Sequence, residues 1–504
     1  MLAAIEMKGI TKSFPGIIAN DQIDFSVNKS EIRGLLGENG AGKSVLMKIL
    51  YGLYRSDEGE IFVNGHLTEM DSPANAIKQG IGMVHQHFML VPSLTVIENI
   101  ILGKESTKRM IFLDENVMMK DVTNFCKLYN LDVDLKAPVY TLSVGVQQRV
   151  EILKALYRGA DILILDEPTA ILTPQEVEEL FKAIRQLKND GKTVVFISHK
   201  LKEVLTICDT ITVLRKGKVV RTVKASETNQ IKLANMMVGR RIITDFKKTL
   251  QPSNHNILKV SNIKAINDRK LTVLNGVNFE IYSSEILGLA GIEGNGQTEL
   301  IEIIMGLRKA SSGKILLEDN EITKMSTRER IRLGISHIPE DRHKRGLIPD
   351  FSVMENLILG SQSDPQFTKW GFIFNNEETS KYSNKLIKDY KIDTTSKDAY
   401  SRYLSGGTQQ RVIVAREFSR NPKLIIAAQP TRGLDVAGTE YVHLKLVGMR
   451  NQGAAIFLIS ADLDEIWALS DRIAVLYEGK IVAIKKPKET NQQELGLLMT
   501  GGSP

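Results

Sequence analysis

The stretch of the sequence with the clearest chemical meaning is GENGAGKS at residues 37–44, which fits the pattern G-x-x-x-x-G-K-[ST]. In this pattern the glycines let main-chain N–H groups surround phosphate oxygens at the start of a helix, where the helix dipole also favours anions. Lys43 is then expected to reach the β- and γ-phosphates of a nucleotide, and the Ser44 hydroxyl is expected to bind Mg²⁺. The loop residues predicted to hold the nucleotide are Gly37, Glu38, Asn39, Gly40, Ala41, Gly42, Lys43 and Ser44.

Two adjacent carboxylates follow an apolar run in DILILDEPT at residues 161–169. Carboxylates at the end of a buried strand are costly unless a cation or a reacting water uses them. Asp166 is therefore predicted to be a metal ligand. Glu167 is predicted to orient and deprotonate an attacking water.

His199 and Gln86 complete the set of residues that could act on a phosphate. His199 ends the apolar run VVFISH, and taken alone it would be interpreted as a core histidine. Beside a phosphate loop, an imidazole at a strand end can instead hold the γ-phosphate. The amide of Gln86 offers an uncharged ligand to the metal or to water.

The sequence repeats itself, which sets the number of domains. Lys43 lies opposite Gln297 at a spacing of 254, whereas Ser143 lies opposite Ser405 at a spacing of 262. The second copy therefore holds eight extra residues, expected around residues 361–376. The predicted division is a first domain at 1–239, a linker at 240–256 that contains Pro252, and a second domain at 257–504.

The elements that must position these residues alternate between strands and helices. Short apolar runs at 31–37 and 285–291 enter glycine turns, and β-branched runs at 160–168 and 192–199 are bounded by polar residues. Residues 174–191 have apolar residues at helical spacing, with a proline near the start and Gly191 at the end. The predicted class is α/β, with one nucleotide-binding core occurring twice.

Composition limits the function classes. The length of 504 residues requires at least two domains, and the net charge of +7 is spread along the chain, which favours a solvated surface over a nucleic-acid or anionic-membrane partner. Cys126 and Cys208 are isolated, which is typical of a reducing compartment and argues against structural zinc or an iron–sulfur cluster. No signal peptide is expected, and no apolar run reaches the roughly 18 residues of a membrane helix. A membrane function would need a partner to hold the chain there.

The motifs together resemble the nucleotide-binding subunits of ATP-binding-cassette (ABC) transporters. LSGGTQQR at 404–411 is specific to that family, and the resemblance covers nearly the whole chain twice. It implies two tandem cassettes, each with a P-loop α/β core and an α-helical subdomain, and it implies ATP and Mg²⁺ as cofactors. It identifies Phe14 as the ring that stacks on adenine, Gln86 as the glutamine coupled to the membrane partner, and His199 as the switch histidine.

Two fused cassettes resemble the ATPases of importers for ribose, galactose, xylose and related sugars, and the altered second copy is most similar to the nucleoside-uptake branch. The resemblance implies integral-membrane permease subunits as partners, an extracytoplasmic solute-binding protein acting indirectly, and a peripheral location at the cytoplasmic face of the membrane. No nucleic-acid partner and no insertion of the chain into the membrane are expected.

In this family the cassettes pair head to tail, so the phosphate loop of one meets the signature of the other. The first site would then be completed by Ser405, Gly406, Gly407 and Gln409. The second site would be degenerate, because lysine, acidic and histidine positions have changed. Its residues would be Gly291, Gly294, Gly296, Gln297, Thr298, Glu340, Ala428, Gln429, Ala461, Ser143 and Gly145. Such a site could hold a nucleotide without hydrolysing it, or could serve as a folded partner that never binds ATP.

Two other readings stay open. Tandem cassette proteins also act on ribosomes or nucleic acid, although the translation type usually has a long charged linker and two competent sites. The chain could also power transport of an unrelated solute. Changes confined to one predicted site favour an importer ATPase with a single hydrolytic site.

Overall fold

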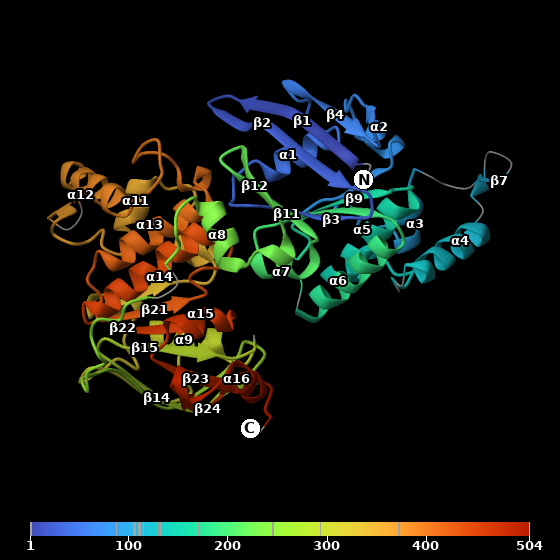
Figure 1. Ribbon diagram of the computed structural model, residues 1–504. Coiled ribbons are helices and arrows are strands. Elements are labelled where there is room, and N and C mark those ends of the chain that lie inside the picture. Colours follow the sequence, from blue (N-terminus) through green and yellow to red (C-terminus); the bar gives the residue numbers. More distant parts are fainter. Residues whose placement is uncertain are drawn as a thin grey trace. The chain divides into compact units, whose positions relative to one another are not determined.

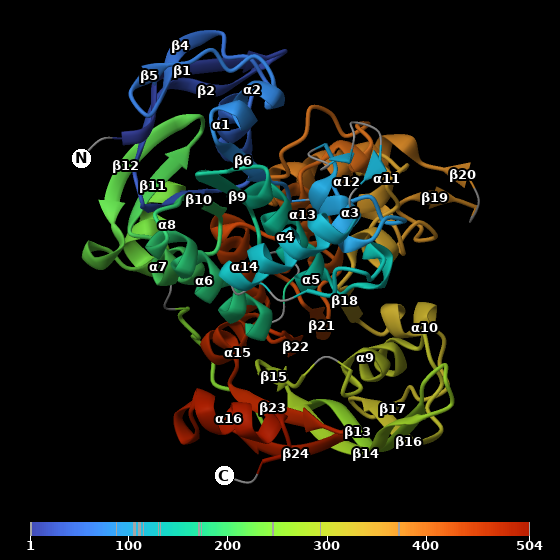
Figure 2. The ribbon, with the colours of Figure 1, turned by 90° about the vertical axis from the view of Figure 1, so that its right-hand side faces the viewer.

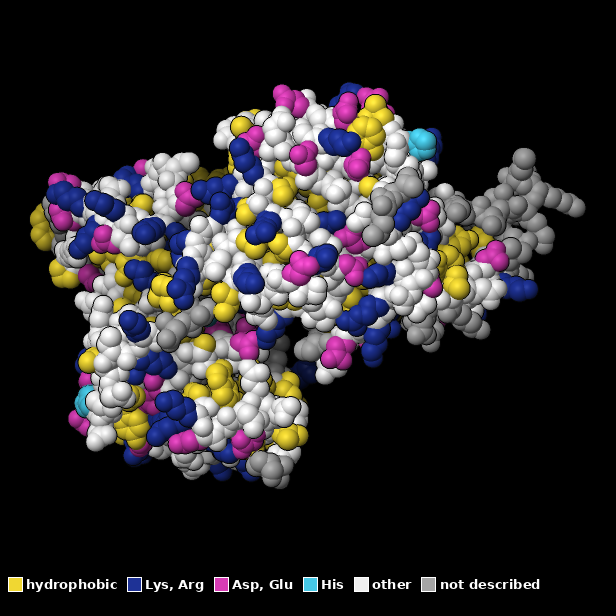
Figure 3. Space-filling view, viewed as in Figure 1, with side chains coloured by type: hydrophobic (Ala, Val, Ile, Leu, Met, Phe, Trp, Pro, Cys, Tyr) yellow, Lys and Arg dark blue, Asp and Glu magenta, His cyan; other side chains and the backbone are white. Residues whose placement is uncertain are grey.

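The computed structural model describes residues 3–86, 88–103, 107–108, 112–113, 115–129, 131, 133–169, 172, 174–243, 246–292, 294–370 and 373–502. The chain divides into two compact units, unit 1 at Met1–Ile242 and unit 2 at Ile243–Pro504 (Figure 1). Among the described residues, no helix combines the length and apolar character needed to cross a membrane. On the face drawn in Figure 3, Lys and Arg side chains are interspersed with Asp and Glu.

Unit 1 is built on two sheets. A four-stranded antiparallel sheet has the order β2-β1-β4-β5, and a six-stranded sheet has the order β12-β11-β3-β10-β9-β6. The first contains β1 (Ala3–Phe14), β2 (Ile17–Asn28), β4 (Glu58–Val63) and β5 (His66–Leu67). The second contains β3 (Ile32–Gly37), β6 (Ile81–Val84), β9 (Ile162–Asp166), β10 (Thr193–Ser198), β11 (Thr210–Arg215) and β12 (Lys218–Lys224). A short hairpin joins β7 (Thr107–Lys108) to β8 (Phe112–Leu113).

Helices cover these sheets and form a separate layer beside them (Figure 2). Helix α1 contacts both β2 and β3, so it lies between the two sheets, whereas α3, α4 and α5 pack on one another. The helices of unit 1 are α1 (Lys43–Leu50), α2 (Pro73–Lys78), α3 (Val96–Ile101), α4 (Glu115–Leu128), α5 (Val144–Tyr157), α6 (Pro174–Asn189), α7 (Leu201–Ile207) and α8 (Gln230–Val238), with short 3₁₀ turns η1 (Val139–Thr141) and η2 (Ala225–Glu227).

The core of unit 1 explains the sheet order. Strands β3, β6, β9, β10 and β11 are parallel, and their residues are almost all buried, as expected for parallel strands covered on both faces. One apolar cluster joins α1 to both sheets through residues such as Ile5, Leu46 and Ile164. Because parallel strands end at one edge, the loops after β3, β6, β9 and β10 meet there, the usual place for ligands in an open α/β sheet.

Unit 2 repeats this plan element by element. Its sheets have the orders β14-β13-β16-β17 and β18-β21-β22-β15-β23-β24. The strands are β13 (Asn256–Ile266), β14 (Thr272–Tyr282), β15 (Ile286–Ala290), β16 (Ser312–Leu317), β17 (Asn320–Glu321), β18 (Ile335–Ile338), β19 (Thr368–Lys369), β20 (Ile373–Phe374), β21 (Leu424–Ala428), β22 (Ala455–Ile459), β23 (Arg472–Tyr477) and β24 (Lys480–Lys485). The helices are α9 (Gln297–Met305), α10 (Thr327–Arg332), α11 (Val353–Ile358), α12 (Asn376–Asp389), α13 (Gly406–Phe418), α14 (Val436–Asn451), α15 (Leu463–Leu469) and α16 (Gln492–Met499), with the turns η3 (Arg342–Gly346), η4 (Ser401–Tyr403) and η5 (Pro487–Glu489).

The extra residues of unit 2 lie in more places than predicted. Between β18 and α11 there are 14 residues, against 11 between β6 and α3, and η3 is a π-turn within this longer loop. Between α11 and β19 there are nine residues, against five between α3 and β7. The prediction that all the extra residues lie around 361–376 was therefore wrong for the three in the loop that contains η3.

None of the described residues of the predicted linker before β13 lies in a helix or strand, yet much of this segment is fixed to unit 2. The main-chain carbonyl of Leu250 accepts from Arg450 Nη1 at 2.7 Å, and the side chain of Asn451 bonds to the main chain of Lys247 and Thr249. The ring of Phe246 meets His443 edge-on. Residues 246–250 thus lie along the end of α14.

Candidate active site

The phosphate loop of unit 1 needs its glycines for steric reasons. Gly40 and Gly42 have φ values of 78° and 99°, in the left-handed region that favours glycine. A Cβ on Gly42 would lie 2.3 Å from the carbonyl oxygen of Ala19, so no side chain fits there. The main chain can therefore turn tightly from β3 into α1 and direct its N–H groups toward a bound anion.

Lys43 is the buried cation of this loop. Its side chain is only 5% exposed, and Nζ donates to the carbonyl oxygens of Gly37 at 2.7 Å and Glu38 at 2.9 Å. These bonds hold the ammonium group inside the loop, where it faces the space that the N–H groups surround. The predicted role of Lys43 as a ligand of the β- and γ-phosphates fits this position.

Ser44 and Asp166 lie together, as the metal prediction requires. Ser44 Oγ donates to Asp166 Oδ1 at 3.4 Å. Asp166 is buried, and burial, together with the neighbouring charge of Glu167, raises the pKa of its carboxyl group. A hydroxyl and a buried carboxylate next to a phosphate loop form a donor set that suits Mg²⁺, which prefers oxygen ligands.

Glu167, His199 and Gln86 also converge. Glu167 Oε1 lies 3.0 Å from His199 Nδ1, and Gln86 Nε2 donates to Glu167 Oε2 at 3.3 Å. The hydrogen bond from His199 lowers the pKa of Glu167, which outweighs the opposing effect of burial. An ionised carboxylate held between an imidazole and an amide can accept a proton from water.

Phe14 lies at the end of β1, half-buried, with its ring edge-on to Tyr54 at 5.6 Å between centroids. Lys12 Nζ is 5.8 Å from the centre of the same ring. This contact joins Phe14 to the segment that follows α1. Stacking of Phe14 on adenine stays a prediction.

Unit 2 keeps the loop and changes its chemistry. Gly294 and Gly296 have positive φ values, like their counterparts Gly40 and Gly42, and a Cβ on Gly291 would lie 2.6 Å from Gln297 Nε2. Gln297 Nε2 donates to the carbonyl oxygen of Ile292 at 2.8 Å, where Ile292 is the counterpart of Glu38. The amide keeps one of the two contacts of the lysine but brings no charge. Thr298 is exposed in the first turn of α9.

The strand-end residues of unit 2 bond to one another instead of forming an acid–base set. Ala428 ends β21, and Gln429 Oε1 accepts from the main-chain N–H of Ala461 at 3.1 Å. Glu340, the counterpart of Gln86, forms an ion pair with Arg432. No carboxylate stands at the Asp166 or Glu167 positions, so the two predicted reaction roles are both missing in this unit.

The signature residues begin helices. Ser143 caps α5 and Ser405 caps α13, where Ser405 Oγ accepts from Thr408 N at 3.2 Å. Space around Gly407 is open, whereas a Cβ on Gly145 would lie 2.3 Å from the Glu176 carboxylate.

Gln409 of the signature is buried and bonds within its own unit. It is 4% exposed, and its Nε2 donates to the carbonyl oxygen of Ser401 at 3.0 Å. A contact between Gln409 and a nucleotide stays a prediction.

Arg342 is a site residue that motif matching missed. It lies in η3, after the counterpart of Gln86, and its guanidinium donates to the carbonyl oxygens of Gly406 and Arg432, each at 2.9 Å. It therefore ties this loop to the signature of unit 2. The sequence carries a weak signal for it, because the copies differ in length here.

The fold and these residues define the class of protein, which is a P-loop ATPase made of two α/β cassettes. Residues 20–170 and residues 274–432 each match the family described as "ABC transporter", and the chain belongs to that family. Binding and hydrolysis of ATP follow from this membership.

Curated relatives resemble the chain over its whole length. It is 48% identical to the guanosine import ATP-binding protein NupO of Bacillus subtilis, over 99% of this chain and 98% of that protein. It is 45% identical to the nucleoside import ATP-binding protein NupA of Lactococcus lactis, with the same coverage. It is 42% identical to the glucose import ATP-binding protein TsgD13 of Haloferax volcanii, over 99% of this chain and 96% of that protein.

Among solved structures, the archaeal ribosome recycling factor aABCE1, in complex with the ribosomal stalk protein aP1, covers 95% of this chain and 90% of its own at a TM-score of 0.61. The identity is 19%, so this likeness shows the fold alone.

Proposed function

We propose that the chain is the ATP-hydrolysing subunit of an importer that takes up nucleosides, with simple sugars as the second solute class. Two observations support this function. The predicted catalytic residues of unit 1 are bonded together, with Glu167 held by His199 and Gln86. The relatives named for guanosine and nucleoside import are more similar than the relative named for glucose import.

The reaction follows from the residues of unit 1. The loop N–H groups and Lys43 bind the phosphates of ATP, and Glu167 accepts a proton from a water whose oxygen attacks the γ-phosphorus. The bond between the γ-phosphorus and the bridging oxygen breaks, which leaves ADP and phosphate. Ser44 and Asp166, with help from Gln86, would hold Mg²⁺, which when bound would neutralise charge on the phosphate oxygens.

The family pattern also supports a role for the signature of unit 2. In that pattern Ser405, Gly406 and Gly407 complete the site of the first phosphate loop, whereas Ser143 and Gly145 complete the degenerate one. Hydrolysis is then confined to the site that contains Glu167, because the other has neither a base nor a lysine.

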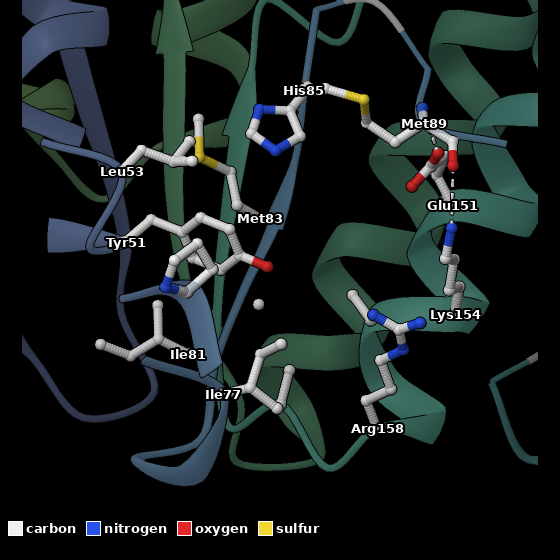
Figure 4. A pocket seen from close by; sticks show the side chains of 14 residues that line it. Tyr51, Leu53, Ile77, Ile81, Met83, His85, Met89, Glu151, Lys154 and Arg158 are labelled. Atoms are coloured by element: carbon white, nitrogen blue, oxygen red, sulfur yellow. Dashed lines mark hydrogen bonds between the residues drawn. The ribbon is translucent and has the colours of Figure 1, made fainter. Parts of the chain in front are cut away.

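A permease is the partner through which this chain acts on a membrane. A cavity of about 250 Å³ in unit 1 is lined in part by His85 and Met89, which lie on either side of Gln86 in the sequence (Figure 4). Its lining also includes Tyr51, Ile77, Met83 and Arg158. We assign it to a short amphipathic segment of a permease, which would hold the chain at the cytoplasmic face. A solute-binding protein outside the cell would act only through that permease.

Uptake assays test this function. Deleting the gene should reduce uptake of labelled guanosine, and restoring the wild-type gene should recover it, whereas a gene with Glu167→Gln should not. Labelled ribose and glucose test the second solute class in the same cells. Unchanged uptake of all three solutes after deletion would contradict the proposal.

A further inference from the structure

Two charged side chains of α5 hold one peptide of the loop that follows Gln86. Glu151 Oε1 accepts from the main-chain N–H of Met89 at 2.6 Å, and Lys154 Nζ donates to the carbonyl oxygen of Met89 at 3.0 Å (Figure 4). Glu151 is 4% exposed and Lys154 is 8% exposed. We call this pair and its target the Met89 clamp.

The Met89 clamp joins two parts of unit 1 with different roles. Met89 comes three residues after Gln86, and its own side chain is 62% exposed and lines the cavity described above. Helix α5 begins directly after Ser143, the first signature serine. The clamp is thus a direct polar link between the signature helix and the loop that carries Gln86.

A gain in folding stability does not explain why Glu151 and Lys154 are buried around the Met89 peptide. Burial raises the pKa of Glu151 and lowers the pKa of Lys154, so both charged forms are disfavoured by their surroundings. Replacing buried charges by well-packed apolar groups is often neutral or stabilising. A bonded pair of this kind instead holds the loop in one position against the helix.

The positions of unit 2 that correspond to the Met89 clamp hold different residues. There the counterpart of Met89 is Gly346 and the counterpart of Glu151 is Ile413, and a Cβ on Gly346 would lie 2.7 Å from Ile413 Cδ1. An apolar contact therefore stands in place of the bond from Glu151. Arg416, the counterpart of Lys154, bonds instead to Glu417 and to the carbonyl oxygen of Asn356. Among the described residues, a pair of charged side chains bonded to one peptide of this loop occurs in unit 1, which holds the predicted catalytic residues.

A second side-chain contact near Met89 has an equivalent within unit 2, so it shows which contacts the common fold requires. Asn99 bonds to both the N–H and the carbonyl oxygen of Val91, and Asn356 does the same to Ile348. This asparagine contact belongs to the common fold. The Met89 clamp is an addition to it.

We propose that Glu151 and Lys154 are positioning residues that make α5 and the loop after Gln86 move as one body. A segment docked in the cavity then shifts Gln86 and the signature helix together, a consequence that rests on the proposed function. The clamp itself is a property of unit 1 and can be tested without any partner.

The first test measures hydrogen exchange of residues 88–91 in the full chain. Glu151→Leu and Lys154→Met should each speed exchange there about tenfold, because a buried bond to a charged group is lost. Glu151→Gln keeps an acceptor and should stay close to wild type. Arg149→Met, on the same helix but paired at the surface with Glu179, is the matched control. Equal exchange in Glu151→Leu, Lys154→Met and wild type would overturn the proposal.

The second test measures ATP turnover of the chain with and without its reconstituted permease. Glu151→Leu should lower the ratio of permease-stimulated to basal turnover about tenfold, and Glu151→Gln should restore most of it. Equal losses in both turnovers, or no rescue by glutamine, would contradict the positioning role. A wild-type chain that no permease stimulates would instead contradict the proposed function, while the exchange result still decides the clamp.

Discussion

Glu167 and Gln429 occupy equivalent strand ends, and their backbones are nearly the same. Their φ values are 48° and 46°, and each main-chain N–H donates to the neighbouring strand, at Ile197 and at Ile459. The left-handed backbone persists in unit 2, where the acid is absent. This conformation is therefore a property of the fold, and the reaction depends on what the side chain contacts.

Glu167→Gln should remove the base and leave phosphate binding intact. Gln can still bond to His199 and Gln86, so the local geometry is kept while the proton acceptor is lost. Turnover should fall about 10²–10³-fold, with ATP retained on the protein. Steady-state ATPase assays and retention of labelled ATP would measure both effects. Turnover within a few fold of wild type would exclude Glu167 as the base.

The Glu167→Gln variant also tests how the stability of the folded chain depends on pH. The bond from His199 lowers the pKa of Glu167 below its ordinary 4.5, so ionised Glu167 stabilises the folded chain above about pH 4.5. That contribution disappears as pH falls through the lowered pKa. The stability advantage of wild type over Glu167→Gln should therefore shrink on acidification from pH 7, measured by denaturant unfolding. An advantage that grows toward low pH would contradict the assigned interaction.

At the scale of elements, local patterns predicted most of the fold because both copies carry them. Glycine turns after apolar runs indicated β3 and β15, and the confirmed α/β class follows from strand and helix alternation. The convergence of Glu167, His199 and Gln86 could be anticipated, because parallel strands end at one edge. The Met89 clamp could not be predicted from the sequence, because Glu151 and Lys154 have the spacing of charged residues on an exposed helix face. Only the packing of α5 against the loop shows that both are buried.

The packing of the linker against unit 2 could not be predicted from its sequence either. Pro252 and its polar neighbours indicated a free connection, but Arg450 reaches from α14 to Leu250 and also bonds to Asp471 through Nε and Nη2. Arg450 is 1% exposed. Nothing local to the linker sequence reveals this buried partner, which comes from a helix about 200 residues later.

Arg450→Met should therefore destabilise unit 2 by about 1.5–3 kcal/mol, because Asp471 would lose its bonds from Arg450 while it keeps its ion pair with Lys248. Its counterpart in unit 1 is Lys188, which bonds to Asp209 at 2.6 Å at the surface. Lys188→Met is the matched control and should cost less than about 1 kcal/mol. Calorimetry of the full chain would compare them. Equal small effects would show that the packed linker contributes little.

At the scale of the whole molecule, the two cassettes have the same elements and different chemistry. Lys43 and Glu167 in unit 1 correspond to Gln297 and Gln429 in unit 2, and these changes all belong to one predicted site. Unit 2 has its own buried core and helix caps, so it is folded in the same way although its reactive residues differ. We therefore expect one hydrolytic event per chain in each cycle.

The two signature serines test how the cassettes share that event. Both cap a helix, so Ser143→Arg and Ser405→Arg carry similar folding costs of about 1 kcal/mol. If the family pattern holds, Ser405→Arg should abolish turnover and Ser143→Arg should be the milder change. ATPase assays on the reconstituted transporter would compare them. The opposite order would reassign the signature that serves Glu167.

The most direct test of a single hydrolytic site compares the two phosphate loops. Lys43→Ala and Gln297→Ala truncate side chains at equivalent positions, each bonded to the carbonyl oxygens of its own loop. Steady-state ATP turnover should fall about 10²–10³-fold for Lys43→Ala, because the cation facing the phosphates is lost. It should stay within about twofold of wild type for Gln297→Ala, since a neutral amide stabilises little transferring charge. A loss in Gln297→Ala as large as that in Lys43→Ala would contradict the account.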